Sequence, residues 1–421
     1  MIGFIRVLFL IIGVMAIWIG INIAATTQGW FSHPIATKGD SVAFMSEAVK
    51  SIKNNSNGNA TVVLMKNGQI FDKFSTSQGT PVSSDTVFGV SSLGKWVAAV
   101  GVMTLVDQGQ LNLDTPVSNY LTRWQLPVSE FNNDDVTIRR LLSHTAGIID
   151  GLGHNGFATQ EQVQSLEDHL TKALDADEGI SGKVMVSVPP GSQFKYSGGS
   201  YNLLQLIVEE VSGMSFEDYM AKAVFIPLGM TNTTYHHDGV QSLAQYFDDK
   251  GEIRQYPYYT SLAATGLYSS AEDLIKFLSL NVAPNLTEQP KIVAPELLEL
   301  MRTPHASTMG INVWGLGVML FADNNEGGFI IGHGGQSPSL NSTARINPAT
   351  GNGIIMLTTG NRALASDTAT QWTLWETGNP DMYMLKNMIP DMLKRTAIGC
   401  AVILLMSLII VWLRKRRRSI A

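Results

Sequence analysis

Ser92-Leu93-Gly94-Lys95 stands at the start of a long apolar stretch that predicts a helix. Residues three apart lie on one face of a helix, so the amine of Lys95 can approach the Ser92 hydroxyl. A serine hydroxyl becomes a good nucleophile when a neighbouring base takes its proton, and Ser-x-x-Lys is one of the short motifs in which lysine helps to do so. The stretch therefore predicts a serine nucleophile at a helix amino terminus.

The same spacing occurs a second time, at Ser192-Gln193-Phe194-Lys195, so the surrounding sequence has to decide between the two. Ser192 follows Pro189-Pro190-Gly191, which indicates a turn that leads into extended chain. Ser92 instead opens an apolar helix, whose first N–H groups and positive dipole end favour a developing oxyanion. Ser92 is therefore the candidate nucleophile, although the motif alone is equally compatible with a helix cap and a solvated Lys95.

Composition narrows the possible classes of protein. The 421 residues suffice for two or three domains or for one large α/β unit, and the net charge of −6 indicates no nucleic-acid surface. The only cysteine, Cys400, lies in an apolar run, so no disulfide is expected. His236 and His237 are adjacent and no His-Glu-x-x-His occurs, so we predict neither a metal site nor a cofactor.

The amino-terminal segment 1–30 is predicted to be a signal-anchor or transmembrane segment. It is apolar from Val7 to Ala25 apart from Asn22, and Arg6 precedes it. Signal-peptide cores usually run for ~7 to 15 residues. The greater length favours a retained helix, and cleavage near Ala24-Ala25 remains the alternative.

A second apolar run, 396–413, is predicted to be a transmembrane helix, joined to the body by a linker at 378–395. The basic tail 414–421 that follows is expected to stay in the cytoplasm because positive flanks remain inside. The alternative for this tail is a patch for lipid headgroups or nucleic acid. Arg6 also favours an inside amino terminus. Two spans would place both termini in the cytoplasm and the body outside it, in the periplasm or the extracellular space.

Strands are predicted near both ends of the body at 38–377, with helices between them. An amphipathic helix is expected over 39–51, and Asn67-Gly68 between apolar runs predicts a hairpin. Three short strands follow at 328–331, 342–346 and 353–358, and helical patterns cover 93–108, 201–212 and 271–280. This order predicts an α+β fold, in which one antiparallel sheet is closed by the two ends of the body and carries an inserted, mainly helical region.

Several segments in chain order accompany Ser92 and Lys95. They are Phe88, the Gly-Gln-Leu-Asn-Leu-Asp segment 109–114, the Leu-Leu-Ser-His-Thr-Ala-Gly segment 141–147, the Tyr-Ser-Gly-Gly segment from Tyr196, the Pro-Leu-Gly-Met segment 227–230 and the Gly-His-Gly-Gly segment 332–335. Together they resemble the family of class C β-lactamases, low-molecular-weight penicillin-binding proteins and related serine esterases and D-peptidases. The resemblance covers roughly residues 40 to 365 and implies a β-lactamase/transpeptidase-like fold.

The resemblance also implies roles for individual residues. Ser92 looks like the acylated nucleophile, Lys95 its partner, and Tyr196 the tyrosine that moves protons between the serine, the leaving group and water. Free tyrosine and lysine titrate near ~10 and ~10.4, so two such groups placed together are expected to titrate jointly. His333-Gly334-Gly335 takes the place of a Lys-Thr-Gly triplet, and the backbone N–H groups of Ser92 and Gln336 would form the oxyanion hole.

Two departures from the family pattern limit the expected activity. Gly198 replaces an asparagine whose amide would bind a peptide or lactam, which argues against efficient β-lactam hydrolysis. His333 replaces a lysine with a group that titrates near ~6.5, so binding of a substrate carboxylate is expected to be weaker or pH-dependent. An imidazole that only anchors a glycine-rich strand edge is the alternative. His144 is expected to belong to a structural loop rather than to a catalytic triad.

The sequence thus predicts a membrane-anchored, extracytoplasmic serine hydrolase that forms an acyl-enzyme on peptide, ester or amide substrates. A small molecule or a cell-wall peptide is the expected substrate, and the lipid bilayer is the other expected partner. The alternative is a non-hydrolytic membrane sensor or scaffold that becomes acylated without turning over. A transporter component is disfavoured because neither apolar run contains a charged residue.

Overall fold

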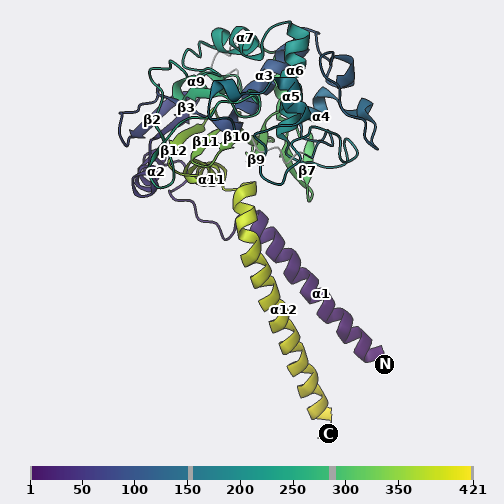
Figure 1. The fold of residues 1–421 in the computed structure, drawn as a ribbon. Coiled ribbons are helices and arrows are strands. Elements are labelled where there is room, and N and C mark those ends of the chain that lie inside the picture. Colours follow the sequence, from purple (N-terminus) through teal and green to yellow (C-terminus); the bar gives the residue numbers. More distant parts are fainter. Residues whose placement is uncertain (1, 150–154, 284–290, 419–421) are drawn as a thin grey trace.

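The computed structural model describes residues 2–149, 155–283 and 291–418. A body of strands and helices sits at one end of two long terminal helices (Figure 1). The predicted fold class is confirmed, since the body contains an antiparallel sheet with helices on both faces and both chain ends form apolar helices. Of the predicted basic tail, residues 419–421 lie outside the described part of the chain.

Within the described residues the strands are β1 (Ala60–Lys66), β2 (Gln69–Thr76), β3 (Val87–Gly89), β4 (Tyr246–Phe247), β5 (Ile253–Arg254), β6 (Tyr268–Ser270), β7 (Ala306–Thr308), β8 (Ile311–Trp314), β9 (Met319–Asp323), β10 (Phe329–Gln336), β11 (Leu340–Ile346) and β12 (Gly353–Thr359). The α-helices there are α1 (Ile2–Thr27), α2 (Ser41–Asn55), α3 (Gly94–Asp107), α4 (Ile138–Leu142), α5 (Leu166–Thr171), α6 (Gly198–Ser212), α7 (Phe216–Met220), α8 (Ile226–Leu228), α9 (Ala271–Ser279), α10 (Pro295–Arg302), α11 (Leu364–Thr377) and α12 (Met382–Arg418).

The main sheet has the strand order β2-β1-β12-β11-β10-β9-β8-β7, with antiparallel neighbours throughout. The amino-terminal hairpin β1–β2 pairs with the carboxy-terminal strand β12, with Val62 opposite Met356. Its turn uses Asn67 and Gly68, both at positive φ, as the Asn-Gly pair predicts. The two ends of the body therefore close one sheet.

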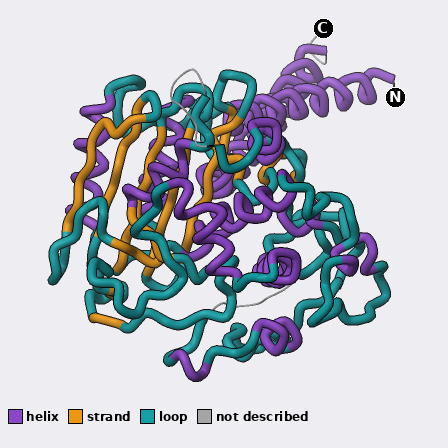
Figure 2. Tube along the Cα trace, turned by 90° about the horizontal axis from the view of Figure 1, so that it is seen from above, coloured by secondary structure: helices purple, strands orange, loops and turns teal. Residues whose placement is uncertain are grey.

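The central strands β11 and β12 are buried at every position because helices cover both faces of the sheet. Val63 and Met65 of β1 belong to a core shared with α3, α6 and α9. Val62 and Leu64 point the other way, into a core shared with α2 and α11. Figure 2 shows the strands side by side with helices in front of and behind them. A strand covered on both sides reads as a continuous hydrophobic run.

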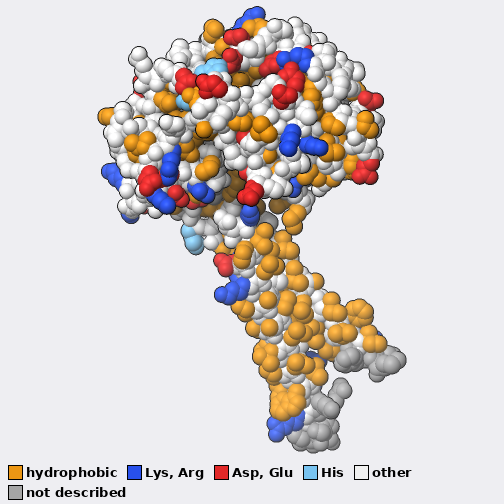
Figure 3. Space-filling view, in the orientation of Figure 1, with side chains coloured by type: hydrophobic (Ala, Val, Ile, Leu, Met, Phe, Trp, Pro, Cys, Tyr) orange, Lys and Arg blue, Asp and Glu red, His pale blue; other side chains and the backbone are white. Residues whose placement is uncertain are grey.

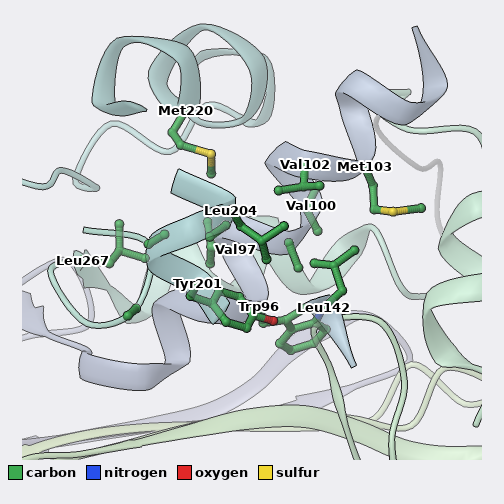
Figure 4. Close-up of a cluster of buried hydrophobic side chains, with 14 of the residues drawn as sticks. Trp96, Val97, Val100, Val102, Met103, Leu142, Tyr201, Leu204, Met220 and Leu267 are labelled. Atoms are coloured by element: carbon green, nitrogen blue, oxygen red, sulfur yellow. The ribbon is translucent and has the colours of Figure 1, made fainter. Parts of the chain in front are cut away.

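Helix α3 runs through the centre of the larger core. Its residues from Gly94 to Leu105 are all buried, which fits a helix that is almost entirely apolar. Figure 4 shows Trp96, Val97 and Val100 among side chains from α4, α6 and α7. The residue that precedes this helix by two positions is Ser92, so a rigid core element supports the candidate nucleophile.

Two stretches differ from their sequence-based predictions. The strand expected at 328–331 continues as β10 to Gln336, so it carries the whole segment from His333 to Gln336. The expected linker at 378–395 is helical from Met382 and continues without a break into the second apolar run. Pro390 lies inside this helix. The prolines suggested a tether, but the Asp381 carboxylate accepts from the Met384 N–H at 2.8 Å and starts the helix despite them.

Two helical stretches are long and apolar enough to cross a membrane: Ile5–Thr27 of α1 and Met382–Arg414 of α12. They pack against each other and leave the same side of the body (Figure 1), and hydrophobic side chains cover most of their surface (Figure 3). Gly399 lets them approach closely, because a Cβ there would lie 2.0 Å from Nε1 of Trp18.

Candidate active site

Ser92 lies in a sharp turn between β3 and α3. Ser91, Ser92 and Leu93 form one turn of 3-10 helix, and α3 begins at Gly94. Ser91 has a φ of +49°, a left-handed conformation that is uncommon for residues other than glycine and is found where the surrounding structure holds it. Ser92 itself is half-buried, so its hydroxyl lies at the amino terminus of α3 within reach of solvent.

Lys95 follows one helical turn later and points back at Ser92. Its Nζ lies 3.1 Å from Oγ of Ser92 and donates to the carbonyl of Ala264 at 2.6 Å. Only 1% of Lys95 is exposed. A buried amine requires hydrogen-bond partners, and these two contacts hold it beside the hydroxyl. The Ser92–Lys95 proximity that the spacing predicted is therefore present.

Tyr196 approaches the same amine from the segment that leads into α6. The centre of its ring is 5.0 Å from Nζ of Lys95, and 40% of the residue is exposed. His144 holds this segment through two hydrogen bonds. Its Nδ1 accepts a hydrogen bond from the Ser197 N–H at 3.1 Å, and its backbone carbonyl accepts one from the Lys195 N–H at 2.8 Å. The imidazole also packs 4.5 Å from the Tyr196 ring. His144 thus has the supporting place expected of it.

Trp314, from β8, forms the floor of the site. Its ring meets Tyr196 at 5.5 Å and His333 at 5.4 Å, both edge to face, and its Nε1 donates to the Leu142 carbonyl. The indole is 2% exposed. Such edge-to-face contacts fix the orientation of aromatic rings. The sequence does not indicate this role for Trp314, because a lone tryptophan belongs to no motif.

Strand β10 brings His333, Gly334, Gly335 and Gln336 alongside the serine turn. The Ser342 hydroxyl, on the neighbouring strand β11, donates to the carbonyl of Val90 at 2.6 Å and ties the turn to the sheet. A Cβ on Gly335 would lie 2.0 Å from that same carbonyl. Glycine is therefore required at 335 for the strand to pass so close to the turn that carries Ser92.

Of the remaining candidate residues, some lie in the active site and others do not. Gly198 is the buried first residue of α6, two positions after Tyr196, and offers no amide group there. The second Ser-x-x-Lys pair, Ser192 and Lys195, is exposed. Ala264 contributes only its carbonyl, which no sequence motif reveals. In the described part of the chain, no group of three or more His, Cys, Asp or Glu residues could hold a metal ion.

Comparison with known proteins agrees with this geometry. The family model described as beta-lactamase matches residues 46–378, which span most of the chain and include every residue of the candidate active site. The chain belongs to the beta-lactamase family. Membership places it, at the general level, among serine hydrolases and confirms the resemblance read from the sequence.

Curated relatives and solved structures in this family include penicillin-binding proteins. Protein flp of Staphylococcus aureus (strain COL) is 24% identical over 71% of this chain, and the match spans 59% of its own length. Penicillin-binding protein 4 of Amycolatopsis lactamdurans is 29% identical, over 67% of this chain and 74% of its own. The octameric penicillin-binding protein homologue from Pyrococcus abyssi is 25% identical with a TM-score of 0.65, covering 79% of this chain and 77% of its own.

A D-stereospecific amidohydrolase from Streptomyces shares the fold. Its TM-score is 0.60 at 20% identity, and the match covers 79% of this chain and 98% of that one.

His333 is electrically neutral in this member of the family. Its burial, together with the positive charge of Lys95, lowers the pKa of the imidazole to about 3. Burial, Lys95 and His333 likewise hold the pKa of His144 well below its usual value. The sequence predicts weaker or pH-dependent binding of a substrate carboxylate, and the low pKa favours the first of these, because a buried neutral ring offers no cation near neutral pH.

These buried histidines predict an acid-sensitive fold. Unfolded histidine titrates near ~6.5, and folded His333 near 3, so the unfolded chain binds more protons between these values. The contribution of each such histidine to the free energy of unfolding is complete above pH ~6.5. It falls by about 1.4 kcal/mol per pH unit as the pH drops below that value. Thermal melting of the solubilised chain from pH 7 to 5 should show this fall. His333→Asn should reduce the slope, and an unchanged slope in that variant would contradict the assignment.

The two glycines of β10 offer a matched pair of substitutions. Gly335→Ala places a methyl group against the Val90 carbonyl, whereas the atom nearest to a Cβ on Gly334 is the Ser342 carbonyl oxygen at 3.5 Å. We expect Gly335→Ala to lower the free energy of unfolding by about 1–3 kcal/mol through overpacking, and to slow reaction of a covalent serine probe because the displaced turn carries Ser92. Gly334→Ala should behave like the parent in melting and in probe labelling. Equal behaviour of the two variants would refute the close approach.

Proposed function

We propose that this protein is a membrane-anchored serine hydrolase that forms and hydrolyses an acyl-enzyme at Ser92. One observation carries the proposal: the 3.1 Å contact between Nζ of the buried Lys95 and Oγ of Ser92 at the amino terminus of α3. A nucleophile and a base within hydrogen-bond reach, with the base held by a further group, form the arrangement that activates a serine. The carbonyl of Ala264 is that further group.

In the proposed reaction Oγ of Ser92 attacks a substrate carbonyl and its proton passes to the Lys95–Tyr196 pair. The negative charge that develops on the carbonyl oxygen is stabilised by the backbone N–H groups of Ser92 and Gln336. Collapse of this intermediate expels an amine or alcohol, which takes the proton. Water then attacks the acyl-enzyme, the pair removes its proton, and a carboxylic acid leaves as Ser92 is restored.

The substrate class is a small peptide, ester or amide, and cell-wall peptides are included. Support comes from the family relatives named penicillin-binding protein and D-stereospecific amidohydrolase. The neutral His333 provides no fixed cation for a substrate carboxylate, and Gly198 provides no side-chain amide. Both features favour substrates without a recognised carboxylate, so β-lactam hydrolysis is expected to be slow.

The proposed location is the cell membrane, with the body in the periplasm or outside the cell and both termini in the cytoplasm. Helices α1 and α12 would be the anchors, since both are long and apolar enough to cross a bilayer. Arg6 lies near the end of α1 that is far from the body, and the basic cluster 414–418 lies at the corresponding end of α12. Positively charged flanks of membrane helices remain on the cytoplasmic side, so these two ends are assigned to the cytoplasm. The bilayer is thus a partner, and the net charge of −6 gives no reason to expect nucleic acid.

The test is covalent labelling followed by kinetics. Full-length protein in detergent should react with a fluorophosphonate or penicillin probe, and mass spectrometry should place the adduct on the peptide that contains Ser92. Ser92→Ala should not label, and labelling that persists would refute the nucleophile.

Burst kinetics across a panel of ester, D-peptide and β-lactam substrates then separate an enzyme from a sensor. Steady hydrolysis after the burst supports the hydrolase. One equivalent of product without turnover supports a sensor that retains the fold.

A further inference from the structure

The β7–β8 hairpin at the edge of the main sheet has an exposed, apolar and uncharged tip. Its turn residues Met309 and Gly310 both have positive φ, 50° and 79°, as in a two-residue type I′ turn. Met309 is 94% exposed and Ile311 44% exposed. The segment Ala306-Ser307-Thr308-Met309-Gly310-Ile311-Asn312-Val313 contains no charged side chain.

An uncharged edge with an apolar tip is unusual for a surface in water. β7 is the last strand of the sheet, and edge strands usually carry charges or proline that prevent pairing with other chains. Single exposed apolar residues are common, so exposure alone would not require an explanation. The position of this hairpin in the molecule provides one.

The hairpin points to the side of the body from which α1 and α12 leave (Figure 1). Hydrophobic side chains lie along this lower edge of the body beside the two helices (Figure 3). Trp30 and Phe31, just after α1, are 62% and 48% exposed. Arg395 of α12 lies 4.2 Å over the Phe31 ring and donates to Oγ1 of Thr26. Aromatic and basic residues of this kind mark the water–lipid boundary of a membrane helix.

We propose that the tip of the β7–β8 hairpin rests in the lipid headgroup layer as a third contact with the bilayer, beside α1 and α12. This inference depends on the membrane anchoring proposed above. Met309 and Ile311 supply apolar surface, and the absence of charge lowers the free-energy cost of leaving water. Lipid covers the tip in this arrangement, which removes the need for the usual protective charges on the edge.

The hairpin also connects the bilayer to the candidate active site. Trp314, at the other end of β8, packs against Tyr196 and His333, and lies three residue steps along the strand from Ile311, about 10 Å. A membrane contact at the tip therefore holds the floor of the site at a fixed, short distance from the lipid surface. This arrangement suits substrates that are themselves attached to the membrane.

Site-directed fluorescence in liposomes tests the contact without use of any enzymatic activity. In a Cys400→Ser background, Met309→Cys carries an environment-sensitive fluorophore, and the matched control is Ile226→Cys. Ile226 is 74% exposed and begins α8, which the turn Ala221–Phe225 joins to α7. Helix α7 lies on the side of the body opposite α1 and α12 (Figure 1). We expect blue-shifted emission at 309 and at least twofold stronger quenching by nitroxide-labelled lipids at 309 than at 226.

Three results would overturn the proposal. Equal quenching at 309 and 226, in protein that resists alkaline carbonate extraction, would refute the hairpin contact and leave the anchoring intact. Release of the chain by carbonate would refute both. A blue shift at 309 that grows with protein concentration and is insensitive to nitroxide lipid would show that a second copy covers the tip. Met309→Asp with Ile311→Asp should leave melting unchanged, which separates the contact from folding.

Discussion

Lys95→Ala is expected to slow acylation of Ser92 by roughly 10²- to 10⁴-fold, the range typical of proton transfer by positioned side chains, because the proposed Lys95–Tyr196 pair loses one member. The Lys95 amine touches the Ser92 hydroxyl directly and is almost completely buried, so no water-exposed group can take its place without rearrangement. The rate of covalent labelling by a fluorophosphonate probe, followed over time in the full-length protein, measures this step apart from turnover.

The chain contains its own control for this prediction. Lys195 lies three residues after Ser192, with the same spacing as Lys95 after Ser92, but both of these residues are exposed. Lys195→Ala should therefore label at the parental rate. Near-normal labelling of Lys95→Ala would refute the assignment, and so would an equal loss in both variants.

Tyr196→Phe separates the two members of the proposed pair. The Tyr196 ring lies over the Lys95 amine, so the two groups are expected to work as one unit. Residues that act as a unit give losses that do not add. The Lys95→Ala, Tyr196→Phe double variant should therefore label about as slowly as the slower single variant. Strictly multiplicative losses would show that the two side chains act in separate steps.

What the sequence predicts well is local or periodic. The Ser92–Lys95 contact follows from helical spacing, and the β1–β2 turn follows from the positive φ that Asn67 and Gly68 tolerate. Strand patterns at the two ends of the body, with helical patterns between them, predict one sheet, and β1 does pair with β12. In the first two cases the physical cause lies within a few residues of its effect, and in the third the order of strands and helices along the chain is sufficient.

What the sequence does not predict depends on contacts between distant residues. The carbonyl of Ala264 and the ring of Trp314 reach the site from far along the chain and carry no motif of their own. The low pKa of His333 arises from burial, which no local pattern around it reveals. The prolines of the segment 378–395 suggest a loose tether, whereas a distant strand holds the beginning of that segment in place.

Asp381→Asn is expected to destabilise the body by roughly 3–5 kcal/mol, the usual cost of removing one partner of a buried ion pair. Asp381 is 0% exposed and accepts from Nη1 of Arg345, a 1% exposed residue of β11. The Arg345 guanidinium also lies 3.7 Å over the Phe321 ring and donates to the Thr373 hydroxyl. Without the carboxylate, this buried cation keeps its desolvation cost and loses its counter-charge. Thermal melting of the solubilised full-length chain measures the loss.

Asp391→Asn is the matched control because Asp391 is an exposed carboxylate on α12, the helix that Asp381 immediately precedes, and it should melt like the parent. Replacement of both partners, as Arg345→Met with Asp381→Leu, should recover much of the stability, since an apolar pair leaves no buried charge. Equal melting of Asp381→Asn and Asp391→Asn would show that the ion pair contributes little.

If the loss is as large as expected, the stable body extends past residue 377 to Asp381, and α12 is attached rigidly to β11, the strand that neighbours β10. A soluble fragment ending at Thr377 would then leave Arg345 unpaired in the core and should fold poorly, whereas one that retains the first turn of α12 should not.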